Sequence, residues 1–290
     1  MGLTIDRLDP TLKALVLGSL LGDIYFLNGD AGDDHANAQD FDHAMKTLRA
    51  AVMRASTGNH DYILCFGAET GTAAVAIAQA DLHIIGIGNG GPGNVIGRGF
   101  QYTCPATVDT LQPAATADGL ELAGIQFTCH ATDHILMDDA GADRLYIHHN
   151  TIMGSTTLSV AVRFDLEGAY PVLEENHFYL CKLPIDLIGA YSVARKNYFQ
   201  DVSTTAIGIN IATGDYGIVD GNIFNLSGGT GDTGVKIAAG ANYWTVSNND
   251  FNASLSDAIS DGGTGTLKIN NRSASILGAT GASIQLAISD

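Results

Sequence analysis

An asparagine that recurs at a nearly constant spacing through the second half of the chain constrains the fold more than any other feature. The repeated residue occurs at Asn150, Asn176, Asn197, Asn222, Asn249 and Asn271. The average spacing is about 24 residues, within the range of solenoid repeats. Between successive asparagines lie two short segments in which apolar and polar residues alternate with the period of a β-strand. The repeat therefore predicts a strand, a turn, a second strand and a second turn.

A phenylalanine follows the asparagine by two residues in several repeats: Phe178, Phe199, Phe224 and Phe251. In a parallel β-helix the coils stack at the strand spacing of about 4.8 Å, so equivalent residues form ladders along the axis. We expect an internal phenylalanine stack and a ladder of mutually bonded asparagine amides. The asparagines are expected at the bend, in the left-handed conformation that Asn tolerates. The predicted fold class is all-β, a right-handed parallel β-helix of about nine coils, with the hand taken from the preference of parallel crossovers.

The residues ahead of the solenoid are expected to form an arm and an N-terminal α-helical cap. Apolar residues recur at helical spacing over 41–55, and Asp40 is placed to cap this helix. A second short helix is expected within 9–18. A helix at this end would cover the open edge of the first coil. The expected domains are therefore 1–61, the arm and capping helix, and 62–290, the β-helix.

The first half of the solenoid is less regular. Strand-like runs occur at 62–66, 75–78, 82–88 and 120–127. The Gly-, Ala- and Pro-rich stretch between Asn89 and Asp118 is expected to form loops that extend from one or two coils. The glycine run at 86–99 contains a match to a dinucleotide-binding fingerprint, but no helical pattern follows it, so no cofactor is expected.

The charge balance excludes several classes of partner. The chain has 14 basic and 31 acidic residues and a formal net charge of −17, so a basic surface for nucleic acid or anionic lipid is not expected. No stretch reaches the roughly 20 apolar residues of a membrane helix, and no secretory signal is recognised. The cysteines are Cys65, Cys104, Cys129 and Cys181. Their spacing fits neither a zinc site nor a redox motif, and buried thiols made in a reducing cytoplasm are expected.

The histidine pairs do not predict a metal site. His148 and His149 are adjacent in an expected strand, so their side chains should point to opposite faces. His130 and His134 have the spacing of helical metal ligands, but they lie in a region without a helical pattern. We therefore predict neither a metal nor a cofactor.

Alignment of the coils places three aspartates at one outward position. Asp138, Asp165 and Asp186 lie 12, 11 and 11 residues before their asparagines, and Asn210 and Lys236 continue the column. Three carboxylates at strand spacing are weak candidates for catalytic residues, because such a column could supply an acid and a base for glycoside cleavage. It could also bind a hard cation, or be a solvated acidic face.

Four motifs occur in the first third of the chain: GDIYFLNGDAGDD at 22–34, AMKTLRAAV at 44–52, HDYILCF at 60–66 and DLHIIGIGNG at 81–90. They resemble motifs of a group of bacteriophage virion proteins of the right-handed parallel β-helix, or pectin-lyase-like, superfamily. The resemblance implies a homotrimer that serves as a head decoration or fibre, or a tailspike that binds or cleaves polysaccharide. The enzyme branches of the superfamily resemble this chain less. Arg144, Arg163, Arg195 and Lys196 match no pectate lyase motif, and the adjacent Asp138 and Asp139 lack the accompanying polygalacturonase elements.

The expected function is that of a non-enzymatic structural protein in a phage virion. It would be a trimeric head decoration or fibre protein attached to the major capsid protein. The alternative is a tailspike-like protein that binds host polysaccharide or cleaves it as a lyase or glycoside hydrolase, which a solvent-facing aromatic groove would favour. The apolar-rich arm, 1–22, is expected either to pack along its own β-helix or to dock on a capsid neighbour or sister subunit.

Overall fold

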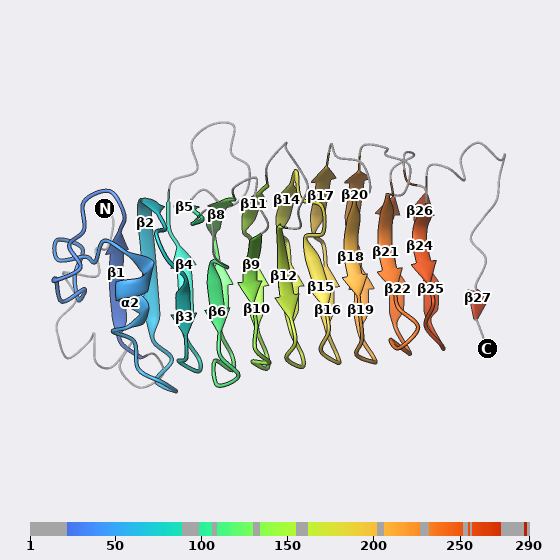
Figure 1. Cartoon of the computed structure of the whole chain (residues 1–290), viewed down its shortest axis with the longest axis horizontal. Helices are drawn as coiled ribbons and strands as arrows, with labels where there is room; N and C mark the ends of the chain where they lie inside the picture. The colour runs from blue at the N-terminus through green and yellow to red at the C-terminus, as the bar shows by residue number, and fades with distance from the viewer. Residues whose placement is uncertain are drawn as a thin grey trace, which may run out of the picture.

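The chain forms a β-solenoid whose coils lie side by side in chain order along one axis (Figure 1). The computed structural model describes residues 22–88, 99–105, 109–129, 134–154, 162–201, 206–226, 232–251, 255, 257–273 and 287–288. The strands of successive coils pair in parallel and build three faces. The all-β parallel solenoid expected from the repeat is therefore confirmed, while its hand stays a prediction.

The three faces take their strands in rotation along the chain. The first face contains β1 (Ile24–Asn28), the start of β2 (Tyr62–Thr70), β4 (His83–Gly86), β7 (Glu121–Ala123), β10 (Tyr146–His148), β13 (Val172–Glu174), β16 (Val193–Arg195), β19 (Ile218–Asp220), β22 (Thr245–Ser247) and β25 (Leu267–Ile269). The second contains the end of β2, β5 (Phe100–Thr103), β8 (Ile125–Thr128), β11 (Thr151–Met153), β14 (His177–Tyr179), β17 (Tyr198–Asp201), β20 (Ile223–Leu226), β23 (Asp250–Phe251) and β26 (Arg272–Ser273). The third contains β3 (Val75–Ile77), β6 (Leu111–Pro113), β9 (His134–Asp138), β12 (Val162–Leu166), β15 (Ile185–Leu187), β18 (Ile207–Ile211), β21 (Thr233–Ile237) and β24 (Asp257–Asp261). The short β27 (Ala287–Ile288) pairs antiparallel with β25.

The solenoid has about seven turns, fewer than the expected nine. Seven coils, from β4–β5–β6 to β22–β23–β24, each contain three separate strands. In the first turn β2 serves two faces as one continuous strand, pairing with β4 and then with β5. The expected count divided the chain by one period, but the coils differ in length. His83 and its partner Glu121, for example, are 38 residues apart.

The predicted phenylalanine stack is present inside the solenoid. The rings of Phe178, Phe199, Phe224 and Phe251 are buried, and successive centroids lie 5.1, 4.7 and 4.8 Å apart. The rings are nearly parallel, with interplanar angles of 11° or less. Space for this stack depends on glycine in the third face, because a Cβ on Gly208 would lie 2.5 Å from the Phe224 ring.

The asparagine ladder also forms as predicted. The Asn176 amide donates to the Asn197 side-chain oxygen over 3.1 Å, and the Asn197 amide donates to that of Asn222 over 3.0 Å. Each side-chain oxygen also accepts from the backbone N–H of the preceding ladder residue, as between Asn176 and Asn197. The ladder therefore satisfies buried polar groups of the turn and ties each coil to the next.

The left-handed conformation lies one residue earlier than predicted. The residues with positive φ are those immediately before the ladder, namely His149, Glu175, Lys196, Gly221, Asn248 and Asn270. The asparagine itself turns inward, because its amide must reach the amide of the next coil. The preceding residue therefore makes the bend.

The predicted N-terminal helical cap over 41–55 is wrong. The helix is only α2 (Leu48–Val52), and Thr47, not Asp40, is its N-cap. The reason lies at the edge of β1: Met45 donates its N–H to Phe26 and accepts from Asn28, so its backbone is extended against the sheet. Pairing with the free edge of a strand has displaced the first part of the expected helix.

The stretch between Asn89 and Asp118 is not simply loop, since β5 and β6 lie within it and continue the second and third faces. Residues 89–98 and 106–108 lie outside the described residues, as do 1–21 and with them the predicted helix at 9–18. Among the described residues, no helix is long and apolar enough to cross a membrane.

Candidate functional site

The predicted aspartate column has the expected register. Asp138 is paired with Asp165, Asp165 with Asp186, and Asp186 with Asn210, which Lys236 follows. Asp186 alternates with the core residues Ile185 and Leu187 and so lies on the outer side of its strand, yet Asp165 and Asp186 are each only 9% exposed. Asp186 accepts a hydrogen bond of 2.8 Å from the Asn210 amide. The catalytic and cation-binding roles of this column stay predictions.

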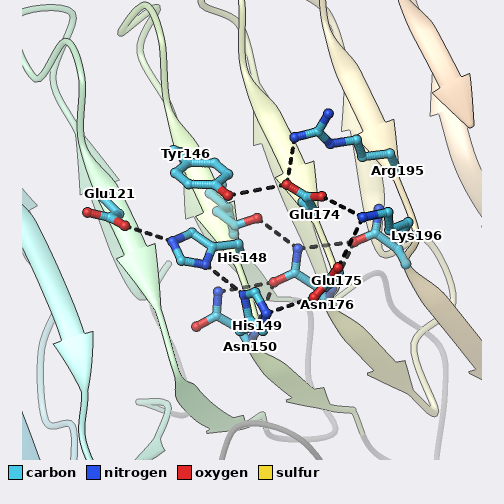
Figure 2. A network of polar contacts seen from close by, with 12 residues as sticks. Glu121, Tyr146, His148, His149, Asn150, Glu174, Glu175, Asn176, Arg195 and Lys196 are labelled. Atoms are coloured by element: carbon cyan, nitrogen blue, oxygen red, sulfur yellow. Dashed lines mark hydrogen bonds and ion pairs between the residues drawn. The ribbon is translucent and has the colours of Figure 1, made fainter.

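A second outward row, on the first face, has more ionisable and aromatic side chains in mutual contact. We call it the polar strip and define it as His83, Glu121, Tyr146, His148, Glu174 and Arg195. It occupies β4, β7, β10, β13 and β16. In the three-residue strands the middle residue is buried, as Ile147 is in β10, so the first and third residues face outward. The ionisable and aromatic side chains of the strip therefore lie together on one face of the solenoid (Figure 2).

Glu121 lies between two histidines of the strip, His83 in the preceding coil and His148 in the following coil. Its carboxylate is 2.7 Å from His148 Nε2 and 2.5 Å from His83 Nδ1. Hydrogen bonds from His148 and then His83 lower the pKa of Glu121 to about 2, against the opposing effect of burial. Glu121 is therefore held ionised at neutral pH.

Glu174 is a second carboxylate of the strip, two coils further along and at the third rather than the first position of its strand. It accepts hydrogen bonds from Arg195 at 2.7 Å, Lys196 at 3.2 Å and the Tyr146 hydroxyl at 3.2 Å (Figure 2). Burial tends to raise the pKa of Glu174, but the hydrogen bonds from Arg195 and Lys196 outweigh it, and the pKa is lowered. This carboxylate too is a stable anion.

Aromatic rings complete the strip. Tyr62 stacks on His83 with a centroid distance of 4.2 Å, and Tyr146 stacks on His148 at 4.1 Å. The expectation that His148 and His149 point to opposite faces is wrong, because their Nδ1 atoms lie only 2.8 Å apart. His149 is at positive φ, which breaks the alternation of the strand.

The contacts of the strip run almost entirely between neighbouring coils. His148–Glu121, Tyr146–Glu174 and Arg195–Glu174 join residues separated by 27, 28 and 21 positions. An acid catalyst at neutral pH requires a carboxyl group with a raised pKa, whereas Glu121 and Glu174 both have lowered values. In the described part of the chain, no group of three or more His, Cys, Asp or Glu could hold a metal ion. The contacts of the polar strip therefore fit a role in linking neighbouring coils and in holding charged side chains at fixed positions.

Sequence analysis overlooked the strip, although a signal was present. Counting back two residues from each asparagine of the ladder gives His148, Glu174, Arg195, Asp220 and Ser247. Within this column Glu174, Arg195 and Asp220 alternate in charge, as expected for side chains that pair along the axis. The alignment of outward charged positions described above used only the third face, where the aspartates lie.

A tyrosine ladder lies at the turn that leads into the first face. Tyr170, Tyr191, Tyr216 and Tyr243 stack with centroid distances of 4.9, 5.6 and 5.0 Å. All have positive φ, and 45–53% of each residue is exposed. Sequence analysis did not predict this ladder. Bulky residues rarely adopt this conformation, so stacking between coils must offset the backbone strain.

Comparison with known proteins adds little beyond this. No protein-family model and no curated protein matches the chain. The chain is similar to the crystal structure of pectate lyase Pel9A, with a TM-score of 0.44, 11% identity, and coverage of 94% of this chain and 80% of that one. For GH136 lacto-N-biosidase from Eubacterium ramulus the values are 0.44, 14%, 86% and 56%. For the complex of XylC with xylose they are 0.41, 11%, 86% and 70%. With every TM-score below 0.5, these matches carry no argument about function.

Proposed function

We propose that the protein is a non-enzymatic structural component of a bacteriophage virion, a trimeric head decoration or fibre attached to the major capsid protein. The observation that carries the proposal is that the polar strip consists of pairs between neighbouring coils. Such pairs resist bending and shear between coils, as a rod under mechanical load requires. The motifs between 22 and 90 that resemble phage virion proteins support the same role.

The electrostatics support this proposal as well. Both central carboxylates are held as anions by fixed partners, Glu121 by two histidines and Glu174 by Arg195 and Lys196. An acid–base catalyst within the strip would instead need a carboxyl group with a pKa near the operating pH, and neither Glu121 nor Glu174 has one. The net charge of −17 fits a protein with neither nucleic acid nor membrane among its partners.

Assembly and location test the structural role. Mass photometry of the purified protein should give about 91 kDa, for three copies of the 30.2 kDa chain. Mass spectrometry of purified virions should detect the protein at a fixed ratio to the major capsid protein. A monomer near 30 kDa that is absent from virions would contradict the proposal.

A second candidate, binding or cleavage of host polysaccharide, is favoured by one observation. Tyr62 and Tyr146 face outward on the first face beside His83 and His148, and sugars stack on exposed aromatic rings. In a glycan-binding assay with host capsule or lipopolysaccharide, Tyr146→Ala should weaken any binding that uses this face. Tyr191→Ala is the matched control, because Tyr191 lies in the tyrosine ladder instead.

Incubation of the purified protein with the same host polysaccharide distinguishes binding from cleavage. Release of reducing ends or unsaturated sugars by the purified protein would overturn the non-enzymatic proposal. Binding without release would make the protein a carbohydrate-binding virion component, whereas neither binding nor release leaves the structural role alone.

A further inference from the structure

We propose that Cys104 and Cys129 are a cross-linking site, at which a disulfide joins two neighbouring coils once the protein meets a small-molecule disulfide as oxidant. This inference is independent of the proposed virion role, because it rests on the thiols alone. Sequence analysis treated all four cysteines as buried thiols and found no pairing in their spacing. The pairing becomes visible only when the coils are stacked.

The stacking of the second face brings the two thiols together. Thr103 in β5 is the register partner of Thr128 in β8, and the cysteines are the next residue in each case. Their Sγ atoms lie 3.3 Å apart, both within the core. Neighbouring strands are about 4.8 Å apart, inside the Cα separation of about 4.4–6.8 Å that a disulfide spans. The sulfurs need to approach by little more than about 1 Å to reach bonding distance.

Oxidation proceeds by two thiol–disulfide exchanges. One cysteine, as its thiolate, attacks the oxidant disulfide, forms a mixed disulfide and releases one thiol. The thiolate of the second cysteine then attacks the protein sulfur of the mixed disulfide, forms the Cys104–Cys129 bond and releases the second thiol. The protein loses two protons and two electrons, equivalent to two hydrogen atoms, and the oxidant takes them up as it is reduced to two thiols.

Burial explains why the two residues can persist as thiols and makes their oxidation slow. The hydrogen bond with Cys104, followed by burial, raises the pKa of Cys129 well above its usual value. Thiolate formation, and access of the oxidant, therefore require a local opening of the second face. The cross-link should form faster at higher pH and under mild destabilisation, and once formed it encloses one coil of 25 residues.

The other two cysteines provide controls. Cys65 is buried in β2, where its thiol contacts the Ile63 carbonyl, and it is not among the groups that affect the Cys129 thiol. Cys181 is close enough to Cys129 to affect its pKa, so it is the competing partner. A Cys129–Cys181 bond would be chemically possible, and the experiment must distinguish it.

The test incubates the full-length protein with oxidised glutathione at pH 8.5, in low and then moderate urea, and measures intact mass without reductant. We expect a loss of two hydrogens, and a peptide map that joins the Cys104 and Cys129 peptides. The melting temperature of the oxidised protein should rise by roughly 5 °C and return on reduction.

The variants complete the test. Cys65→Ser should still form the cross-link, whereas Cys104→Ser should not. A map that joins Cys129 to Cys181, stable glutathione adducts on Cys104 and Cys129, or no mass change even after refolding in the presence of oxidant would each overturn the proposal. Because the wild-type mass and map decide it, a serine variant that fails to fold does not affect the outcome.

Discussion

Glu121 acquires its properties from residues that are far away in sequence. His83 precedes it by 38 positions and His148 follows it by 27, yet both side chains lie on its carboxylate. In an isolated strand this glutamate would have an ordinary pKa, whereas in the stacked coils its pKa is lowered and it stays ionised. The consequence is a measurable dependence of stability on pH.

Glu121→Gln should lower the free energy of unfolding at pH 7 by about 1–2 kcal/mol, discounted for partial exposure. The folded-state pKa of about 2 lies below the usual 4.5, so this stabilisation is present above pH 4.5 and is lost as the pH falls toward 2. Urea denaturation at pH 7 and pH 2 measures it. The exposed Glu167 gives the control variant Glu167→Gln, and a difference that persists at pH 2 would contradict the assignment.

Tyr216 tests the balance between backbone strain and ring stacking. With φ at +64°, it stacks on Tyr191 and Tyr243. Tyr216→Ala loses the stacking and keeps the strain, whereas Tyr216→Gly loses both, so the glycine variant should be more stable by about 1 kcal/mol. Thermal denaturation measures the difference in stability between the two variants. At Tyr146, which lies within a strand, the alanine variant should instead be more stable than the glycine variant, because glycine is unfavourable in a strand.

The asparagine ladder is the element that holds the turns of successive coils together. Asn197 donates to the Leu173 carbonyl and to Asn222, and it accepts from the backbone and side chain of Asn176. These groups are buried, so loss of one amide leaves several polar groups without water or protein partners.

Asn197→Ala should therefore destabilise the protein by about 2–4 kcal/mol. Asn271→Ala, at the partly exposed end of the ladder, should cost clearly less, because water can replace the lost bonds. Urea denaturation of both variants measures the difference. Equal losses would show that the ladder does not depend on burial for its effect.

Glu69 links two elements, β2 and α2, and has the opposite pH dependence to Glu121. It accepts a hydrogen bond of 2.8 Å from the Leu48 N–H. Burial raises the pKa of Glu69 to about 7 from the usual 4.5, although the bond from Leu48 opposes the shift. The folded state holds the proton more tightly, so this contribution to stability is complete below pH 4.5 and declines as the pH rises to 7.

Glu69→Gln removes the charge and keeps an acceptor for Leu48. It should match the wild type near pH 4 and be more stable above pH 7 by up to about 3 kcal/mol. Urea midpoints between pH 4 and pH 8 measure the gap. A gap that does not widen with pH would show that Glu69 is not the titrating group.

The apolar arm, 1–22, is expected to bury its apolar side chains against another surface. It contains nine large apolar residues, Leu3, Ile5, Leu8, Leu12, Leu15, Val16, Leu17, Leu20 and Leu21. The solenoid itself begins by Gly22, whose N–H donates to the His60 carbonyl over 3.0 Å. Deletion of residues 1–21 therefore keeps the bond between Gly22 and His60.

We expect deletion of 1–21 to lower the melting temperature and the solubility, because the arm is proposed to pack along its own solenoid and so shield apolar surface from water. Differential scanning calorimetry and virion-association assays on the same variant measure both effects. An unchanged melt together with loss of virion association would instead place the arm against a capsid neighbour or sister subunit.

The amino-acid sequence was enough to predict the coil period, the phenylalanine and asparagine ladders, and the register of Asp138, Asp165 and Asp186. These features were predictable because coils stack one strand spacing apart, so that equal offsets within the repeat become adjacent positions in space. The same reasoning, applied to the first face, would have placed His148, Glu174 and Arg195 in one column, but would not have predicted the contacts of Glu121 with its two histidines.

Other features depend on which groups meet across coils of unequal length, and these became visible only in the three-dimensional structure. The backbone of Met45 hydrogen-bonds to the free edge of β1, and the helix is therefore shorter than expected. The contact of Cys104 with Cys129 and the two histidines on Glu121 likewise arise from coil-to-coil register. No local pattern encodes such contacts, because hydrogen bonding and electrostatic pairing act between atoms close in space, whatever their separation along the chain.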